Sequence, residues 1–452
     1  MESNPNETYF SGARRGGVWL TVGLALAAPG LFFLAMEPYA LGAGATDRAA
    51  TLALFTLLFW GALALLYRGW GVRAPVELYA AAGALLLIAL FLRVRCLDVV
   101  TPDYRDFLRP WVEEFRQNGG FAALAKIRSD YNVPYLYLLA GLSYLPIDDM
   151  LLIKLTSVVA DLLLVWTAVS LSRYWGLART KKLLLFALLL FAPTLWLNSA
   201  AWAQCDALYT LFALQCFLQA RRGRPWLAVA LAAVGFAFKL QIIFFLPMLA
   251  VFWMSKRVSF KHLLAFPVTY LAVCLPALLL GRPFEKLFTI YVQQVGQYSG
   301  YLTLSAPTVY AFLPDEPHNL LSALGIAAAA VFVLAVLGAA LRRRALDDQL
   351  LLTLALLFCA GLPWLLPSMH ERYFYMADVL AVCYAVARPR RWFVAPLMLY
   401  ASYAGYHAYL VREWLPIRPL GMGLPAVAAA AVAGVALYDF YTSGRRQSVQ
   451  KS

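Results

Sequence analysis

Long, uninterrupted runs of apolar residues recur along this chain and limit the folds that are open to it. Runs of roughly 17–25 such residues can cross the hydrocarbon core of a bilayer as a helix, and they recur from Gly17 almost to the C-terminus. The runs are solidly apolar and do not alternate, so helices are expected and not β-barrel strands. Only 14% of the residues are charged, whereas a soluble protein carries about a quarter. We therefore predict an all-α, polytopic integral membrane protein.

The basic residues form short clusters between the apolar runs. The net charge of +14 would suit nucleic acid if the charge formed a tract, but it does not, so no nucleic-acid partner is expected. Lys/Arg clusters in short loops mark the cytoplasmic side of a membrane protein. Arg14 and Arg15 therefore predict a cytoplasmic N-terminus, and Arg445 and Arg446 a cytoplasmic C-terminus.

Assigning the other basic loops to the cytoplasm predicts about 13–14 transmembrane helices. Residues 225–254 have basic residues on both sides, so we expect two half-length helices with Lys239 at their outer apex. Residues 135–145 are too few to cross and are expected to form a juxtamembrane helix on the outer face. The remaining spans are expected near 17–36, 49–67, 75–95, 151–172, 182–198, 206–220, 261–281, 319–341, 349–366, 374–388, 392–410 and 421–441.

This topology collects polar segments on the outer face, and the richest of them lies in the first outer loop, residues 96–150. Asp103 comes just after a helix end, where a carboxylate can take a proton from a hydroxyl group. The alternative is that Asp103 caps a helix that begins near Tyr104, while Asp106 pairs with Arg109 in solvent.

Aromatic residues mark the next two segments. Tyr131 and Tyr135 either anchor the protein among lipid headgroups or stack against the face of a sugar. Asp206 lies in the turn before another span and could be no more than its N-cap. The candidate residues of these two segments are Asp130, Tyr131, Tyr135, Trp202, Gln204 and Asp206.

Lys239 is the clearest candidate for binding an anion. Its ammonium group lies between strongly apolar segments, where a charge is costly unless it is paired or faces a water-filled cavity. Gln241 follows two residues later and is a candidate for the same role.

The fourth segment runs from Pro367 to Tyr373. His370 and Arg372 are expected in the first turn of a helix, where free N–H groups favour a phosphate. A lone His at a helix start is often a satisfied polar residue. Glu371 is a candidate for binding substrate, although Ser368 with Glu371 also forms a capping-box pattern.

Familiar catalytic signatures are missing from the sequence. We find no Walker loop, no dinucleotide-binding glycine pattern, no HExxH and no Ser/His/Asp signature. The six cysteines show no CxxC spacing, so neither a disulfide framework nor a cysteine metal site is expected. An enzyme on the outer face would have to obtain an activated substrate from the membrane itself.

Taken together, these segments resemble a known group of proteins. The patterns DYxxFLxPW, DYxxPYLYL, WxQxDA, KxQ and HERYFY are similar to those of the membrane-embedded GT-C superfamily of glycosyltransferases, and within it to bacterial relatives of the eukaryotic GPI mannosyltransferases. The resemblance covers about residues 75–425. It makes residues 1–74 a two-helix N-terminal addition and 75–452 the catalytic domain.

The resemblance implies a fold, an activity and a location. The fold would be a GT-C-type bundle in a bacterial-type plasma membrane, with the active site facing the outside or periplasm. The activity would be inverting transfer of a hexose, mannose by default, from a polyprenyl-phosphate-linked donor to a lipid, glycan or protein acceptor.

The resemblance also implies roles for individual residues. The essential acid falls on Asp103, with Asp106 a weaker candidate, and the phosphate-facing residues fall on Lys239, His370 and Arg372. Asn132-Val133-Pro134 replaces the usual paired prolines, and Leu240 stands where the family pattern has proline, so the roles of Asp130 and Gln241 are open. The cofactor is unknown, since two acids and a phosphate could hold Mg²⁺ or Mn²⁺ whereas the basic residues could replace a metal.

Two other functions compete with this interpretation. A polytopic lipid or solute transporter or flippase would also contain charges within the membrane, but it should carry polar residues through the full membrane depth. A noncatalytic membrane scaffold gives no reason for the position of Lys239.

Overall fold

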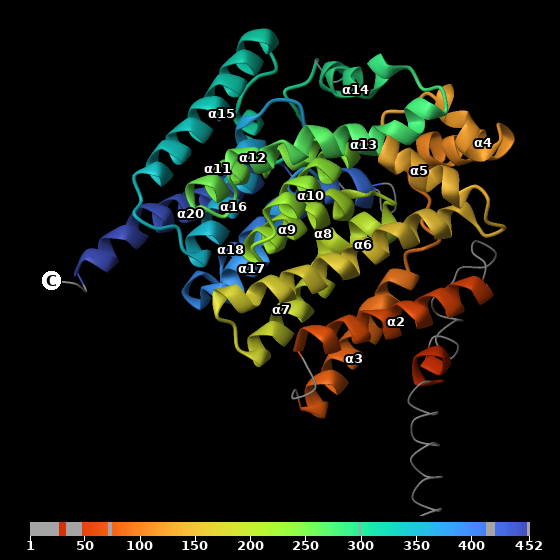
Figure 1. The fold of residues 1–452 in the computed structure, drawn as a ribbon, viewed down its shortest axis with the longest axis horizontal. Helices are drawn as coiled ribbons and strands as arrows, with labels where there is room; N and C mark the ends of the chain where they lie inside the picture. The colour runs from red at the N-terminus through yellow and green to blue at the C-terminus, as the bar shows by residue number, and fades with distance from the viewer. Residues whose placement is uncertain (1–26, 33–47, 71–74, 298–299, 413–420, 450–452) are drawn as a thin grey trace, which may run out of the picture.

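The chain is almost entirely helical in the computed structural model, which describes residues 27–32, 48–70, 75–297, 300–412 and 421–449 (Figure 1). The predicted first span near 17–36 lies mostly outside these residues, as do Arg14 and Arg15. The bundle is built from the α-helices α2 (Arg48–Trp70), α3 (Val76–Val94), α4 (Arg109–Gln117), α5 (Val133–Leu142), α6 (Asp149–Leu171), α7 (Arg179–Phe191), α8 (Pro193–Trp196), α9 (Asp206–Arg221), α10 (Pro225–Phe238), α11 (Pro247–Met254), α12 (Phe260–Leu263), α13 (Ala265–Leu279), α14 (Phe284–Gln297), α15 (His318–Leu341), α16 (Asp348–Leu365), α17 (Tyr375–Ala387), α18 (Val394–Tyr406) and α20 (Gly423–Val449).

Short irregular helices and one pair of strands complete the architecture. The π-helical segments are η1 (Tyr104–Leu108), η4 (Leu197–Ala201) and η8 (His407–Val411). The 3-10 segments are η2 (Gly120–Ala125), η3 (Ser172–Trp175), η5 (Leu240–Phe244), η6 (Val309–Phe312) and η7 (Pro389–Arg391). The strands are β1 (Thr303–Leu304) and β2 (Met369–His370).

Seven of the described helices are long and apolar enough to cross a membrane. An eighth span results if α7 and the segment 193–201, which are bent by 47° relative to each other, are counted as one. Four apolar helices are shorter than this. The prediction of an all-α, polytopic membrane protein is confirmed, whereas the predicted number of about 13–14 crossings stays a prediction.

The spanning helices differ in how deeply they lie in the bundle. In α6 and α16 the most apolar windows are 72% and 78% buried by protein, whereas in α15 only 11% of the window is buried. The helices α6 and α16 therefore form the centre, and α15 lies on the flank, as Figure 1 also shows. The central helix α6 packs against α9, and α16 packs against α20 and α17.

The predicted break at Lys239 is confirmed. Helix α10 ends at Phe238, Lys239 has an extended backbone with φ −157° and ψ 135°, and η5 begins at Leu240. Gly235 allows close packing beside this break, because a β-carbon there would lie 2.9 Å from the Cβ of Phe212 and 2.5 Å from the side chain of Ile242. The run of apolar residues from 225 to 254 therefore folds into two pieces that hold Lys239 at their junction.

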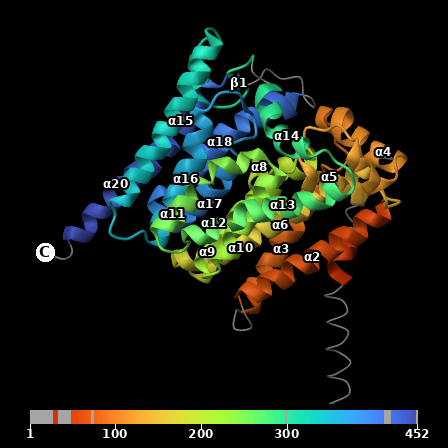
Figure 2. The same cartoon turned by 45° about the horizontal axis from the view of Figure 1, so that its top comes forward.

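The loop elements α4, α5 and α14 gather at one end of the bundle (Figures 1 and 2). The short helix expected at 135–145 is present as α5 (Val133–Leu142). Strand β1 pairs in parallel with β2, with Thr303 opposite Met369 and Leu304 opposite His370. This pairing attaches the loop between α13 and α15 to the segment before α17.

The proposed division at residue 74 stays a prediction, because residues 71–74 lie outside the described part of the chain. Helix α2 packs against α3 and α6. Helix α2 therefore lies directly on the rest of the bundle (Figure 1).

Candidate functional site

A cavity of about 490 Å³, here called the site cavity, lies where the loop elements meet. All four polar segments that the sequence singled out contribute side chains to its wall. Its predicted site residues are Asp103, Asp130, Tyr131, Gln204, Lys239, Gln241, His370 and Arg372. Apolar side chains cover much of the remaining wall, among them Phe107, Leu108, Ile243, Phe244, Ile326 and Leu366.

Three side chains hold the carboxylate of Asp103. Its Oδ2 accepts hydrogen bonds from Trp202 Nε1, at 2.8 Å, and from Gln204 Nε2, and its Oδ1 accepts one from Tyr409 Oη at 3.0 Å. The alternative that Asp103 caps a helix is wrong, because its backbone is already helical (φ −59°, ψ −39°) and its side chain makes no capping hydrogen bond. A capping residue normally has an extended backbone. Asp103 is instead fixed in one orientation at the cavity wall.

Asp106 lies outside the site cavity. Its carboxylate pairs with Arg105 at 2.7 Å, its side chain is 48% exposed, and Arg109 pairs with Glu113 at 2.9 Å. The predicted pairing of Asp106 with Arg109 is therefore wrong. The hydrogen bond from Arg105 lowers the pKa of Asp106, so this carboxylate is a poor proton acceptor compared with an unpaired one.

Gln204 connects the acid to an aromatic wall. Its Oε1 accepts a hydrogen bond from Tyr131 Oη at 3.1 Å, while its Nε2 donates to Asp103. The ring of Tyr131 lies 4.6 Å from that of Tyr135, which is buried behind it and does not line the cavity. Trp202 is also fully buried, and its ring stacks on Tyr409 at 4.8 Å. Of these rings Tyr131 is the one that lines the cavity, while Tyr135 packs against Tyr131 and Trp202 holds Asp103.

Asp206 lies beneath the cavity and holds two cations. It is fully buried, and its Oδ1 is 2.5 Å from Lys239 Nζ while its Oδ2 is 3.6 Å from Arg372 Nε. Asn198 Nδ2 donates to Oδ2 at 2.7 Å. The alternative that Asp206 is an N-cap is wrong, because Cys205 occupies that position and Asp206 is the first helical residue, with its side chain turned to the cations.

The segment around His370 differs from the prediction. Met369 and His370 form strand β2, and α17 begins only at Tyr375, so His370 and Arg372 do not lie in the first turn of a helix. Ser368 makes no capping box with Glu371, because its Oγ donates to the Tyr301 carbonyl oxygen at 2.9 Å. Pairing with β1 keeps Met369 and His370 extended, and residues 371–374 form turns before α17. The segment still turns His370 and Arg372 to the cavity wall.

Glu371 is a buried partner of both neighbours. Its Oε1 accepts a hydrogen bond from Arg372 Nη1 at 2.7 Å, and its Oε2 is 3.5 Å from His370 Nδ1. Burial raises the pKa of Glu371, but the hydrogen bond with His370 and the charge of Arg372 outweigh this and lower its pKa overall. Glu371 does not line the cavity and acts on it through His370 and Arg372.

Arg372 is held as a cation by several acids. Burial lowers its pKa, whereas Glu371, Asp103 and Asp206 raise it well above its ordinary value. Within the described part of the chain its Nε has no hydrogen-bond partner. A guanidinium carries five N–H donors, so Arg372 keeps donors available to a ligand after it has bound Glu371.

The last two predicted residues lie at the margins of the cavity. Asp130 is exposed at the rim, and its backbone carbonyl accepts a hydrogen bond from Gln294. Gln241 is buried, and among the described residues its Oε1 has no hydrogen-bond partner. An unpartnered buried amide oxygen on a cavity wall is a candidate acceptor for a ligand hydroxyl.

Sequence reasoning missed two residues that position Asp103. Tyr409, in η8, donates to its carboxylate, and the only signal for it was the aromatic run at the end of the predicted span 392–410. Lys154, fully buried in α6, donates to the carbonyls of Cys96 and Val99 at 3.0 and 2.6 Å, and to that of Leu97. Lys154 thereby fixes the chain just before Asp103, and its charge inside an apolar run was the overlooked signal.

The side chains around the site cavity do not favour a metal site in which the protein supplies all the ligands. Among the described residues, no three His, Cys, Asp or Glu side chains are grouped to hold a metal ion. A metal at Asp103 would need further ligands from a bound phosphate or water.

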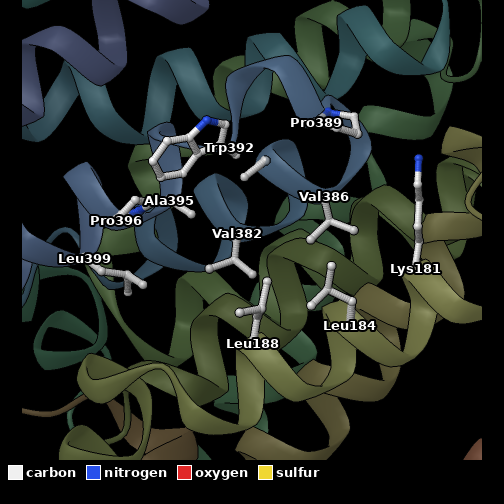
Figure 3. Close-up of a pocket in the computed structure, with 11 residues that line it drawn as sticks. Lys181, Leu184, Leu188, Val382, Val386, Pro389, Trp392, Ala395, Pro396 and Leu399 are labelled. Carbon is white, nitrogen blue, oxygen red and sulfur yellow. The ribbon is translucent and has the colours of Figure 1, made fainter.

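A second cavity, the flank cavity, has about the same size but a different wall. It measures about 500 Å³ and lies between α7, α17 and the start of α18. Figure 3 shows Leu184 and Leu188 facing Val382 and Val386, with Lys181 at one edge. None of the predicted site residues lines it.

The site cavity thus combines a half-buried carboxylate, two paired cations and apolar walls. Such a wall suits a ligand that has a hydroxyl group, an anionic group and an apolar part. A comparison with protein-family models and with curated proteins finds no match for this chain.

Proposed function

We propose that this protein is an inverting glycosyltransferase of the GT-C type. It would move a hexose, with mannose the first candidate, from a polyprenyl-phosphate-linked donor to a hydroxyl group of a lipid, glycan or protein acceptor. One observation carries the proposal: Asp103, Lys239, His370 and Arg372 line one cavity together with apolar side chains.

Asp103 is the general base of the proposed reaction. Its carboxylate takes the proton of the acceptor hydroxyl, whose oxygen then forms a bond to the anomeric carbon of the donor. The bond between that carbon and the phosphate oxygen breaks, and the polyprenyl phosphate leaves with the electron pair. The hydrogen bonds from Trp202, Gln204 and Tyr409 support this role, because they fix the carboxylate in one orientation.

Lys239 and Arg372 stabilise the charge that develops on the leaving phosphate. Asp206 and Glu371 already hold these cations in place, so little reorganisation is needed when the donor binds. Their remaining N–H donors, with His370, form the phosphate-facing side of the site. The apolar wall around Phe244 and Ile326 accommodates the start of the polyprenyl chain.

Tyr131 and Gln204 belong to the acceptor side in this proposal. Tyr131 presents a ring to the cavity, as in many sugar sites, and Gln204 links that ring to Asp103. The complete bundle would contain about 13–14 spans, with the site cavity on the non-cytoplasmic face of a bacterial-type plasma membrane and both termini in the cytoplasm. The basic clusters between the apolar runs support this orientation.

The deciding experiment uses the purified full-length protein in detergent. It is incubated with a panel of polyprenyl-phosphate-linked sugars and candidate acceptors, and released polyprenyl phosphate is measured. We expect release with at least one hexose donor and its loss in Asp103→Asn. No release with any donor, from protein that binds none of them, would reject the proposal.

The same experiment separates transfer from transport. Detergent-solubilised protein has no compartments, so a transporter or flippase produces no glycosylated acceptor. Formation of a glycosidic bond there would reject the transporter alternative.

A further inference from the structure

A buried ion pair lies outside the lining of the site cavity. Arg93 of α3 and Asp161 of α6 have no exposed surface, and Arg93 Nη2 is 3.2 Å from Asp161 Oδ2. Neither residue lines the site cavity. A buried ion pair is weak evidence for a stabilising role, because apolar residues of similar volume often serve a fold equally well. The other hydrogen bonds of Asp161 are therefore the better guide to what it does.

These hydrogen bonds reach two segments of the site. Asp161 Oδ2 accepts a hydrogen bond from Ser199 Oγ at 2.6 Å, and its Oδ1 accepts one from Tyr375 Oη at 2.9 Å. Ser199 lies in η4, three residues before Trp202. Tyr375 begins α17, three residues after Arg372. Asp161 thus holds the segment that leads to the partners of the proposed base and the segment that carries Arg372.

Residues 199–204, here called the linking segment, connect Asp161 to Asp103. Ser199 at its start donates to Asp161. Trp202 and Gln204 at its end both donate to Asp103. A shift at the start of the linking segment would therefore move the groups that orient the carboxylate of Asp103.

The end of the linking segment has a backbone that needs support. Ala203 has a φ of 64°, in the left-handed region that residues with a β-carbon rarely adopt. Such a conformation persists only where the surrounding structure holds it. The N–H of Gln204 donates to the Asn198 carbonyl at 2.9 Å, so this turn is tied back to η4. The positions of Trp202 and Gln204 therefore depend on η4, which the hydrogen bond of Ser199 anchors.

We propose that Asp161 is a positioning residue for Asp103, acting through Ser199 and the linking segment. The inference rests on the proposed function, in which Asp103 is the base. Arg93 compensates the charge of Asp161, and the two carboxylate oxygens accept hydrogen bonds from different segments, which a single hydroxyl or amide oxygen would not match. Asp161 does not line the site cavity, so its effect on the reaction is indirect.

Ser199→Ala tests the proposal in the purified full-length protein, because it removes the link to Asp161 and leaves the ion pair with Arg93 intact. Misplacement of a reacting group by about 1 Å costs about 10²-fold in rate, and a smaller shift of Asp103 should lower kcat about ten-fold. The KM for the donor should stay within about two-fold of the wild type, because the residues proposed to face the phosphate are unchanged.

Ser172→Ala is the matched control. Ser172 is also completely buried, donates to the Val169 carbonyl at 2.7 Å and does not line the site cavity. Both variants lose one buried hydroxyl group, so their melting temperatures should fall by similar amounts, but Ser172→Ala should keep the wild-type kcat. A wild-type kcat in Ser199→Ala, or an equal fall of kcat in both variants, would overturn the proposal.

Amide hydrogen exchange gives a readout that needs no sugar. Peptides that contain the linking segment should exchange faster in Ser199→Ala than in the wild type, and at the wild-type rate in Ser172→Ala. Failure of the proposed function would appear as absent transfer in the wild type with every donor. Failure of this inference would appear separately, as equal exchange of the linking segment in all three proteins.

Discussion

The two cavities are nearly equal in size, about 490 Å³ and about 500 Å³, and nearly opposite in chemistry. The site cavity is walled by acids, bases and amides that come from four distant segments. The flank cavity is walled by side chains such as Leu184 and Val386, with Lys181 at its edge. Volume alone therefore does not distinguish the candidate site in this bundle, whereas converging charged groups with fixed partners do.

Replacing Asp103 is the strongest test of the difference between the site cavity and the flank cavity. Asp103→Asn keeps the shape of the site cavity but removes the proposed base, so transfer should fall by about 10²–10⁴-fold, the usual contribution of general-base catalysis. Released polyprenyl phosphate measures the effect. The melting temperature and donor binding should stay near those of the wild type. Wild-type-like transfer would remove Asp103 as the base.

Lys239 tests whether the buried cations do more than stabilise the fold. Lys239→Met leaves Asp206 with less positive charge and should destabilise the protein by roughly 3–5 kcal/mol. The double variant Asp206→Asn with Lys239→Met removes both charges and should restore much of the stability.

The rate of sugar transfer distinguishes a role of Lys239 in the reaction from a role in stabilising the fold. If the ammonium faces the leaving phosphate, the restored double variant should still be about 10²–10³-fold slower than the wild type. Thermal unfolding and product formation are measured on the same samples. Full recovery of transfer in the double variant would make Lys239 a purely structural residue.

Much of the helical framework was predictable from apolar run lengths, including the break at Lys239 and the short helix α5. Two details of the site were not. Residues 368–374 look locally like a helix start, but Met369 and His370 pair with β1, more than sixty residues earlier, and turns follow before α17. Asp103 accepts hydrogen bonds from Trp202 and Tyr409, which lie 99 and 306 residues further along the chain. Local sequence patterns carry no information about such contacts.

Glu371 makes the stability of the folded protein depend on pH. Its pKa is lowered in the folded state because His370 and Arg372 outweigh the effect of burial. Its stabilising contribution is therefore fully present above the ordinary carboxyl pKa, about 4.3. It is lost as the pH falls through the lower folded-state value.

Melting temperatures of the wild type and Glu371→Gln over the acidic range test this. The wild type should lose more stability on acidification than the variant does. Parallel curves would show that Glu371 has the same pKa in the folded and unfolded states.

Asp106 provides a control inside the same loop. Its side chain is 48% exposed and pairs only with the neighbouring Arg105 in the described structure, so Asp106→Asn should change transfer by no more than about two-fold, in line with exposed substitutions. Kinetics measured beside Asp103→Asn give the comparison. A loss as large as that of Asp103→Asn would move the base to Asp106.

An equally small effect is expected from substitutions in the flank cavity. Leu188→Trp puts a large side chain into it (Figure 3) and should leave transfer within about two-fold of the wild type. Leu188→Ala is the control, because it makes the side chain at this position smaller instead of larger. A large loss of transfer in the tryptophan variant alone would show that a substrate occupies this cavity.

The loop between α13 and α15 joins both sides of the site cavity. On one side Tyr291 Oη accepts a hydrogen bond from Asn132 at 3.1 Å, and Gln294 bonds to the Asp130 carbonyl. On the other side β1 pairs with β2, next to Arg372. The site is therefore cross-linked by a segment that no spanning helix contains. Cleavage of one peptide bond in this loop would leave every spanning helix intact, and it would separate the loop's contacts with Asn132 and Asp130 from its pairing with His370.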